Sequence, residues 1–211
     1  MTYISSRSND NIKLFRKLSE QRKERTEKKL FTLEGVRLVA DAAAENADFH
    51  SIFATEGCLE KYSGALSPVL DNFGGRLFVI TEEIADYIAE TRDSQGIFAI
   101  CKIPDEKPLS DIISRGGKYI MLSDVRDPGN MGTIIRTADA VGTDAVICCG
   151  CCDIYNPKVT RSAMGSLMRM AVAVTDEDSA FEAFRTAGVR TYAAVVDSSA
   201  EKLTSCDFSE G

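Results

Sequence analysis

The first half of the chain alternates amphipathic segments with short apolar runs. Between residues 11 and 29, apolar side chains are sparse and recur at helical spacing among charged residues, as Ile12, Phe15 and Leu18 show, which predicts an amphipathic surface helix. Further strands are expected over residues 30–33, 51–54, 77–80 and 97–103, and further helices over 36–45, 57–66 and 82–90. This order of elements is typical of a small α/β unit that ends near residue 103.

The second half shows a different pattern. Residues 104–108, Pro-Asp-Glu-Lys-Pro, read as a linker. Apolar strands without polar alternation are expected over 118–123, 145–149, 171–174 and 189–195, and helices over 109–114, 130–141, 159–168 and 179–187. Such strands predict a parallel sheet covered on both faces, with ligands bound beyond the carboxyl ends of its strands. Because residues 206–211 are polar and no terminal helix follows, this second unit looks unfinished.

Composition narrows the class of protein. The 211 residues are 44% hydrophobic and 27% charged, which excludes a disordered polymer, a collagen-like repeat and a coiled coil. No apolar run approaches the ~20 residues that cross a bilayer, and the first 30 residues lack a secretory core, so no membrane partner is expected. The seven cysteines are odd in number and crowded, which indicates a reduced protein of the cytoplasm.

Charge is distributed unevenly along the chain. Residues 1–40 carry ten Lys and Arg against five Asp and Glu, whereas the whole chain has a net charge of −7, so the other 171 residues sum to −12. A basic segment in an acidic protein could dock one phosphate backbone. The alternative is a solvated helix face without a partner.

The segment from Leu122 to Ala138 holds the residues best suited to chemistry. Asp124 follows an apolar strand, Asn130 stands at the start of a helix, and Arg136 lies six residues further on. A helix N-terminus with an amide and a guanidinium suits phosphate or ribose oxygens, and Gly132 would let the backbone approach closely. Taken separately, these residues also fit an ordinary Asp-Pro-Gly turn, an Asn N-cap and a surface arginine. The chain contains neither Gly-x-Gly-x-x-Gly nor a Walker phosphate loop, which disfavours dinucleotide and nucleoside-triphosphate sites.

A cysteine cluster offers a rival kind of site. Cys148, Cys149, Cys151 and Cys152 contain overlapping Cys-x-x-Cys spacings that would suit zinc. A closed zinc site needs four ligands, and no second pair lies nearby in the sequence. Cys148 and Cys149 are therefore expected to end a buried strand as small apolar residues, His50 to be incidental, and no metal to be bound.

As a whole string, this segment resembles motif 1 of the SpoU family, the S-adenosylmethionine-dependent RNA 2′-O-ribose methyltransferases of the SPOUT superfamily. The matching positions are Asp124, Asp127, Pro128, Asn130, Gly132, Arg136, Thr137 and Ala138. The resemblance continues through residues 155–158 and 161–166. Upstream, a further set resembles the ribosomal-protein-like RNA-binding domain that precedes many such catalytic domains: Asn11, Lys13, Arg25, Phe31, Glu34, Gly35, Arg37, Gln95, Gly96, Ile97 and Ala99.

The resemblance implies a fold and an activity. It implies an α/β protein with a small N-terminal RNA substrate-binding domain over 1–103, a linker over 104–108 and a parallel-sheet SPOUT methyltransferase domain over 109–211. The implied reaction is methyl transfer from S-adenosylmethionine to a ribose 2′-oxygen of rRNA or tRNA, by a homodimer. Arg136 would orient the ribose hydroxyl and Asn130 would support it. Together with the basic charge of residues 1–40, the resemblance makes Lys13, Lys17, Arg25 and Arg37 the expected RNA contacts.

One departure from the family pattern concerns the methyl donor. The second and third family motifs, Gly-Asn-Glu and Ser-Leu-Asn, form the knot and the donor pocket and would lie beyond Gly211. We therefore expect an incomplete SPOUT domain without the knot-forming segment, no donor-binding residues in this chain, and an inactive fragment. The alternative function is a non-catalytic RNA-binding module fused to an α/β dimerisation domain.

Overall fold

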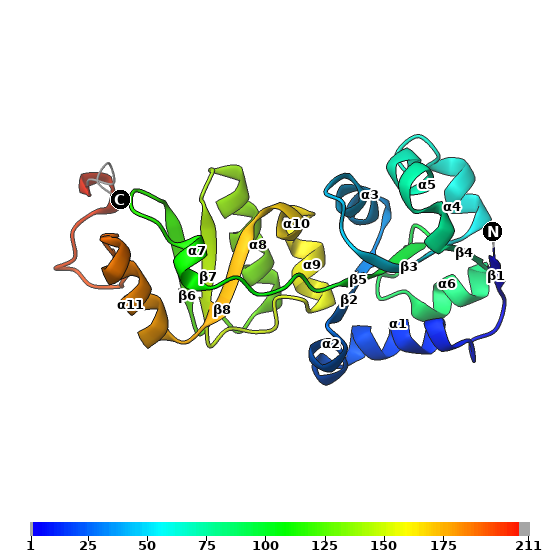
Figure 1. Ribbon diagram of the computed structural model, residues 1–211, viewed down its shortest axis with the longest axis horizontal. Coiled ribbons are helices and arrows are strands. Elements are labelled where there is room, and N and C mark those ends of the chain that lie inside the picture. The colour runs from blue at the N-terminus through cyan, green and yellow to red at the C-terminus, as the bar shows by residue number, and fades with distance from the viewer. Residues whose placement is uncertain (1, 207–211) are drawn as a thin grey trace.

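The computed structural model describes residues 2–206, which form two α/β units side by side along the longest axis of the molecule (Figure 1). The first unit is built on a five-stranded mixed sheet and the second on a three-stranded parallel sheet. Residues 103–108, between the units, have no helix or strand. The expected α/β class is confirmed. No helix in the described part of the chain is long and apolar enough to cross a membrane.

The first sheet has the strand order β1-β4-β3-β5-β2. The first three strands in that order run parallel, and β5 pairs antiparallel with both β3 and β2. The bounds are β1 Thr2–Ile4, β2 Leu30–Glu34, β3 Phe49–Ala54, β4 Leu77–Ile80 and β5 Ile97–Lys102. Because β5 lies between β2 and β3 and pairs with both, residues 97–102 join two strands that come much earlier in the sequence.

Helices cover both faces of this sheet. On one face, α1 (Asp10–Glu20) and α6 (Glu82–Ile88) pack with Phe53 and Phe98 in one apolar cluster. On the other face lie α3 (Val36–Ala44), α4 (Glu56–Lys61) and α5 (Ser67–Phe73), and a short 3₁₀ turn, η1 (Gly74–Arg76), leads into β4. Figure 1 shows α1 and α3 on opposite sides of the sheet.

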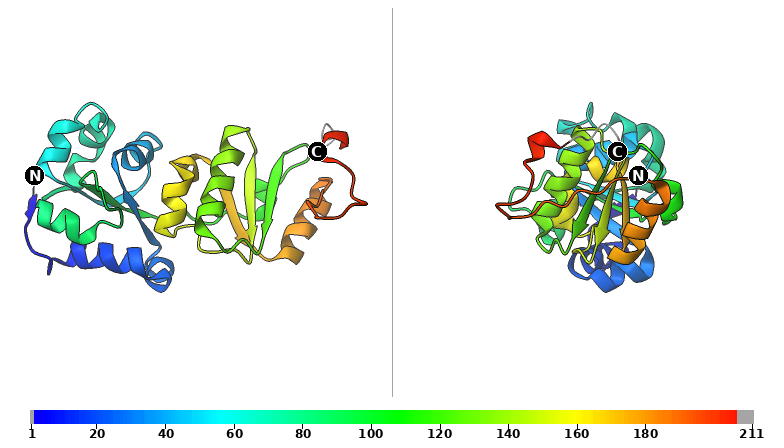
Figure 2. Two further views of the ribbon diagram at one scale, coloured as in Figure 1. Left: turned by 180° about the vertical axis from the view of Figure 1, so that it is seen from behind. Right: turned by 90° about the vertical axis from the view of Figure 1, so that its left-hand side faces the viewer.

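The second unit confirms the parallel sheet. Its strands, in the order β6-β7-β8, are Tyr119–Ser123, Ala145–Cys149 and Ala171–Thr175. The central strand β7 is buried throughout, which explains its lack of polar alternation. One face carries α8 (Pro128–Ala140), α9 (Pro157–Ala163) and α10 (Ser166–Arg169), and the other carries α7 (Leu109–Ile112) and α11 (Glu177–Ala187) (Figure 2).

Two expected helices are each broken in two. The helix expected over 11–29 divides into α1 and α2 (Arg22–Lys28), with Gln21 extended between them. The Arg25 guanidinium donates to the carbonyl oxygens of Leu18 and Ser19, which replaces backbone bonds that a continuous helix would make. The helix expected over 159–168 ends at Ala163, because Met164 and Gly165 both adopt left-handed conformations.

The strand expected over residues 189–195 is wrong. This segment follows α11 as an irregular, largely exposed loop (Figure 1). Apolar residues favour a strand, but a strand forms only where its backbone finds a hydrogen-bonding partner. Sequence reasoning also missed β1 and α5. Near the end of the chain, the structure has a 3₁₀ turn, η2 (Leu203–Ser205), and residues 207–211 of the expected polar terminus lie outside the described residues.

Candidate active site and the junction between the two units

The loop after β6 turns sharply and then starts α8. Asp124 has a positive φ of 56°, and its amide donates to the carbonyl oxygen of Cys149 at 2.9 Å. The N-cap of α8 is Asp127, whose carboxylate accepts the amide N–H of Asn130 at 2.8 Å. Asn130 is therefore not the cap. Its side chain is exposed, and no other described residue hydrogen-bonds its amide group.

Arg136 also lies on the surface of α8. Its guanidinium donates to the Met164 sulfur at 2.9 Å, and among residues 2–206 it forms no ion pair with a carboxylate. A thioether is a weak acceptor, so four of the five N–H groups of this guanidinium stay available. Six helical residues separate Asn130 from Arg136, or about 9 Å along the axis and about 120° around it. A substrate touching both must therefore reach from the first turn of the helix to the third.

Gly132 serves the packing of α8 on α9. A Cβ built on this glycine would lie 2.5 Å from the Ser162 Cβ and 2.6 Å from the carbonyl oxygen of Val159. Real side chains do not tolerate such distances. The close backbone approach expected from the sequence is thus made to a neighbouring helix, and it brings α9 directly against the helix that carries Asn130 and Arg136.

The helix α9 has well-defined ends. Asn156 caps its start by accepting the Lys158 amide at 2.9 Å, and Pro157 occupies the first helical position. Its C-cap is Met164, the residue that contacts Arg136. The segment that resembles the family after the central strand therefore forms a helix whose C-cap residue contacts the candidate catalytic arginine.

The loop before α9 is anchored to the first unit by a buried ion pair. Arg25 is 3% exposed, and its Nη2 and Nε atoms lie 2.7 and 2.8 Å from the Asp153 Oδ2 atom. Beside this pair, the rings of Phe31 and Tyr155 pack with centroids 4.9 Å apart, and burial raises the pKa of Tyr155 to about 12. The structure thus uses Arg25 to join the two units, so its side chain is not available to the RNA phosphate expected from the sequence.

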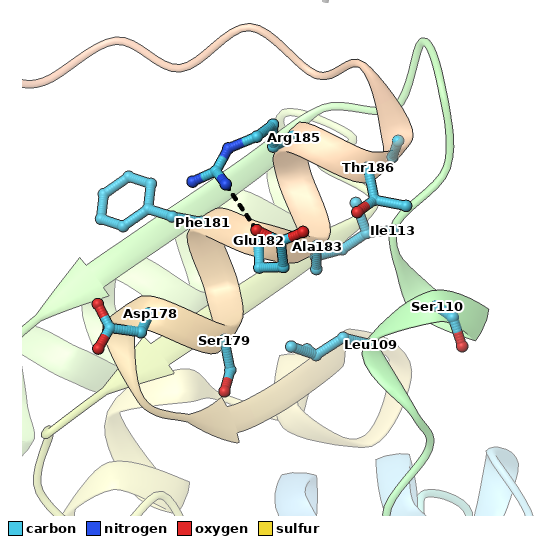
Figure 3. Close-up of a pocket in the computed structure, with 11 residues that line it drawn as sticks. Leu109, Ser110, Ile113, Asp178, Ser179, Phe181, Glu182, Ala183, Arg185 and Thr186 are labelled. Atoms are coloured by element: carbon cyan, nitrogen blue, oxygen red, sulfur yellow. Dashed lines mark hydrogen bonds and ion pairs between the residues drawn. The ribbon is translucent and has the colours of Figure 1, made fainter.

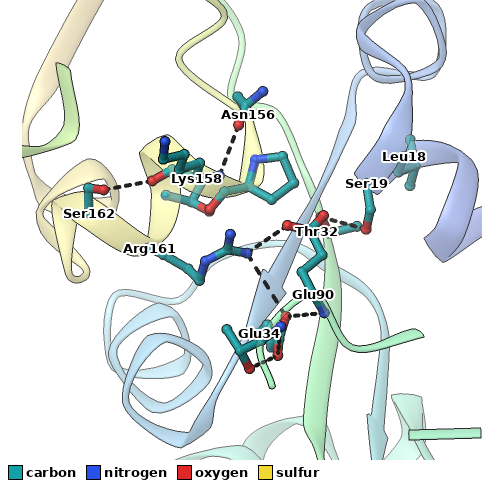
Figure 4. Close-up of polar contacts among 12 residues, drawn as sticks. Leu18, Ser19, Thr32, Glu34, Glu90, Asn156, Lys158, Arg161 and Ser162 are labelled. Carbon is teal, nitrogen blue, oxygen red and sulfur yellow. Dashed lines mark hydrogen bonds and ion pairs between the residues drawn. The ribbon is translucent and has the colours of Figure 1, made fainter. Parts of the chain in front are cut away.

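A second polar cluster lies where α9 faces β2 (Figure 4). Arg161 Nη1 is 2.7 Å from Glu90 Oε2 and 3.9 Å from Glu34 Oε2. The Glu34 carboxylate, whose side chain is 7% exposed, also accepts the amides of Glu90 and Thr91 at 3.0 and 3.2 Å and the hydroxyl of Thr91. Glu34 therefore fixes the loop after α6 and presents it to Arg161.

Gly35 and Gln95, which belong to the same upstream set of family-like residues as Glu34, have structural roles as well. Gly35 has a φ of 105°, which a side chain would make strained. The Gln95 side-chain oxygen accepts the Val36 amide at 2.9 Å. Gly35 and Gln95 thus fix the turn from β2 into α3, next to Glu34, which faces Arg161 of the second unit. Sequence reasoning placed Glu34 in an RNA-binding domain and had no signal for its position at the junction.

The remaining basic residues are exposed but divided between two faces. Lys13 and Lys17 lie on α1, where Lys13 is 3.8 Å from Asp10. Arg37 lies on α3, 3.7 Å from Asp41. Because α1 and α3 cover opposite faces of the first sheet (Figure 1), these three side chains form no single continuous patch.

Polar groups at the carboxyl end of the second sheet are largely occupied by one another. The Ser123 hydroxyl donates to Glu177, Asp124 pairs with Arg126, and the Cys151 thiol is 3.4 Å from the Leu122 carbonyl oxygen. An open hollow of about 1000 Å³ lies elsewhere, between α7 and α11, and none of its lining residues belongs to the loop after β6 (Figure 3). We therefore assign no described residue to binding S-adenosylmethionine.

Cys148 and Cys149 occupy the positions expected from the sequence, whereas His50 lies within β3. Cys148 and Cys149 end β7 and are buried, which raises the pKa of both thiols. His50 is exposed and its ring lies 3.2 Å from the Ser51 hydroxyl. Within residues 2–206, no three His, Cys, Asp or Glu side chains are grouped as a metal site would require.

Comparison with known proteins relates both units to RNA methyltransferases. Residues 117–211 match the SpoU rRNA methylase family, and residues 9–99 match the MRM3-like substrate-binding domain. The chain is 32% identical over 201 residues to the 23S rRNA (guanosine(2553)-2′-O)-methyltransferase RlmP of Bacillus subtilis, covering 95% of this chain and 76% of that protein. It is 34% identical over 145 residues to the mitochondrial rRNA methyltransferase 3A of Danio rerio, covering 66% of this chain and 32% of that protein.

Solved structures agree with these relationships. An rRNA methyltransferase from Sinorhizobium meliloti superposes with a TM-score of 0.76 at 29% identity, over 88% of this chain and 70% of that one. A second structure of an rRNA methyltransferase from this organism, described as bound to AdoMet, gives a TM-score of 0.75 over 88% of this chain and 69% of that one, also at 29% identity. Because the similarity to the Bacillus enzyme extends through both units, the chain belongs to the SpoU rRNA methylase family.

Proposed function

We propose that this protein transfers the methyl group of S-adenosylmethionine to a ribose 2′-oxygen of rRNA. The observation that carries the proposal is the exposed pair Asn130 and Arg136 on α8, in a chain 32% identical to a 23S rRNA 2′-O-methyltransferase. Arg136 has hydrogen-bond donors that no described carboxylate occupies. S-adenosylmethionine supplies an electrophilic methyl group, and the chain supplies the groups that hold the ribose.

Arg136 acts on the ribose by hydrogen bonding and charge. A guanidinium keeps its proton throughout the physiological range, so it serves as a donor to the 2′-oxygen or a flanking phosphate rather than as a base. Holding the oxygen in line with the methyl group lowers the barrier by orientation. The free amide of Asn130 supports the same nucleotide from the first turn of α8.

RNA docking falls to the first unit, which we propose spans residues 1–103, with residues 104–108 as a linker to the methyltransferase domain over 109–211. The absence of helix or strand over 103–108 supports this division. Lys13 and Lys17 on α1 offer exposed ammonium groups to phosphates, and Arg37 offers a contact on the opposite side of the sheet. Arg25 is left out of this set because it is buried against Asp153.

We further propose that the protein works as a homodimer in the cytoplasm. The edge strand β8 and helix α11 leave Val174 59% and Phe181 43% exposed, and a second copy could cover them. All seven cysteines are free thiols, which suits a reducing compartment. Sedimentation equilibrium tests the dimer, and cell fractionation tests the location; a monomer at micromolar concentration, or recovery outside the cytoplasm, contradicts the respective proposal.

The test of the reaction uses rRNA transcripts and radiolabelled S-adenosylmethionine. The expected product is rRNA carrying the label on one ribose 2′-oxygen, found by nuclease digestion and mass spectrometry. Label on a base would contradict the proposed chemistry. RNA binding without any transfer would favour the alternative, a non-catalytic RNA-binding module.

A further inference from the structure

We propose that Arg161 is a positioning residue that couples the first unit to Arg136 through α9. The inference rests on the proposed function for its catalytic meaning, and on geometry alone for the coupling itself. It assigns Arg161 no contact with RNA or with the methyl donor.

The first step of the coupling joins α9 to the first unit. Arg161 projects from α9 between two carboxylates, 2.7 Å from Glu90 and 3.9 Å from Glu34 (Figure 4). Glu34 is nearly buried and holds the loop that carries Glu90 through the amide of Thr91 and that of Glu90 itself. Arg161 thus meets Glu34 on β2 and a loop that Glu34 holds by two backbone amides, and the side chain of Arg161 is only 28% exposed.

The second step joins α9 to Arg136. Arg161 lies in the last turn of α9, and its carbonyl oxygen accepts the amide of Met164, the left-handed cap of that helix. The Met164 sulfur in turn receives the Arg136 guanidinium at 2.9 Å. Met164, which contacts the candidate catalytic arginine, therefore lies only three positions after Arg161, which forms the ion pair.

Packing makes this connection stiff. Gly132 allows α8 and α9 to touch along their backbones, so a shift of α9 cannot be absorbed by an intervening side chain. At the far end of the turn, an added Cβ on Gly165 would lie 2.3 Å from the Asp41 carboxylate oxygen of α3, which shows that this turn is also seated on the first unit. Movement of the first unit on docking RNA would thus be transmitted to Met164 and Arg136.

The alternative is that Arg161 is one of many surface ion-pairing residues with no bearing on the site. Exposed pairs contribute little to stability and nothing to distant geometry. Arg185 is a suitable comparison, because it also pairs with a carboxylate, Glu182 at 2.7 Å, but on α11 and with a side chain 74% exposed. If the coupling exists, variants of Arg161 and Arg185 give different results in the same assays. If Arg161 is an ordinary surface residue, they give the same result.

The experiment reads the Met164 methyl group by NMR in protein labelled at the methionine methyl carbons, with Met164→Leu identifying its signal. Arg161→Ala is expected to shift this signal, because α9 loses its anchor, whereas Arg185→Ala should leave it in place. Arg161→Lys keeps the charge and should shift it less. The charge exchange Arg161→Glu with Glu90→Arg should move it back toward the parent position, while Arg161→Glu alone should not.

Methyl transfer is measured on the same samples. Arg161→Ala should lower kcat about tenfold or more with the KM for RNA within about twofold, since a small misplacement of a positioned group costs rate rather than binding. A Met164 signal unchanged in Arg161→Ala overturns the coupling, even if the variant is less active. A shifted signal in a protein whose parent form methylates no RNA would contradict the proposed function and leave the coupling standing. If Arg161→Ala does not fold, the lysine variant and the charge exchange decide the same question.

Discussion

Two clusters of polar side chains in this protein differ in how completely their groups are partnered. At the junction, Arg25 and Arg161 each meet carboxylates held by backbone amides or buried against neighbouring elements. On α8, Asn130 and Arg136 are exposed, and the sole partner of the Arg136 guanidinium among the described residues is a thioether.

This difference distinguishes arginines that stabilise the fold from an arginine that can bind a substrate. A buried guanidinium that keeps its carboxylate and carbonyl partners contributes to the folded state and has no donors to offer a substrate. A guanidinium without such partners adds little to folding and can bind an oxygen atom that arrives later. In the sequence, Arg136 matches motif 1 of the SpoU family and Arg25 matches the RNA-binding domain that precedes it, so both are candidates for contacting RNA. Their surroundings in the structure give them opposite roles.

The largest effect is expected at the junction. Arg25→Ala removes one partner of a buried ion pair and leaves the Asp153 carboxylate without its partner, so the free energy of unfolding should fall by about 3–5 kcal/mol. Urea denaturation followed by circular dichroism measures this loss. Arg22→Ala, on the exposed surface of the same helix, should change stability by at most about 0.5 kcal/mol. A stability unchanged in Arg25→Ala would mean that the pair does not join the units.

The next effect is on rate alone. Arg136→Ala should reduce methyl transfer by ~10²-fold or more, about 2.7 kcal/mol, with the melting temperature unchanged. Arg136→Lys should be nearly as inactive, because one ammonium group cannot reproduce the planar fork of donors. Asn130→Ala should lose less activity than Arg136→Ala. Full activity in a folded Arg136→Ala protein would remove this residue from the proposed mechanism.

A smaller loss is expected from the contact between the two helices. Gly132→Ala adds a methyl group where Ser162 and a backbone carbonyl already stand, so the free energy of unfolding should fall by about 1–3 kcal/mol despite the better helix propensity of alanine. Gly75→Ala is the matched control, since its added methyl meets open space. Thermal unfolding of both variants compares them directly. Equal melting temperatures would show that α8 and α9 can separate without cost.

The smallest effect concerns the outer surface. The double variant Lys13→Glu with Lys17→Glu should weaken rRNA binding about tenfold at low salt, or about 1.4 kcal/mol, and flatten the dependence of affinity on salt, because phosphate contacts release counterions. Lys107→Glu with Lys118→Glu changes the net charge equally and lies outside α1, so it should bind nearly as the parent does. Filter binding across a salt series distinguishes them. Equal losses in both variants would indicate a general charge effect.

Much of the fold followed from local pattern. Buried strands such as β7 are uniformly apolar, and the amphipathic spacing of Ile12, Phe15 and Leu18 marked the inner face of α1 correctly. The local pattern gave a wrong prediction where the backbone of a segment had no strand to pair with, or where a strand was very short. Residues 189–195 have the apolar character of a strand without a neighbouring strand to pair with in the structure, and β1 is too short to show a period.

The sequence by itself determined most of the order of elements, the parallel sheet and the chemical types along α8, because each of these depends on residues close together along the chain. Only the tertiary structure decided which charged residues face solvent. Arg25 and Asp153 are 128 positions apart, and no local period reports that they meet. The same holds for Gly132, whose neighbour proved to be α9. Burial and pairing depend on contacts between distant segments, and these contacts separate a structural arginine from one that can bind a substrate.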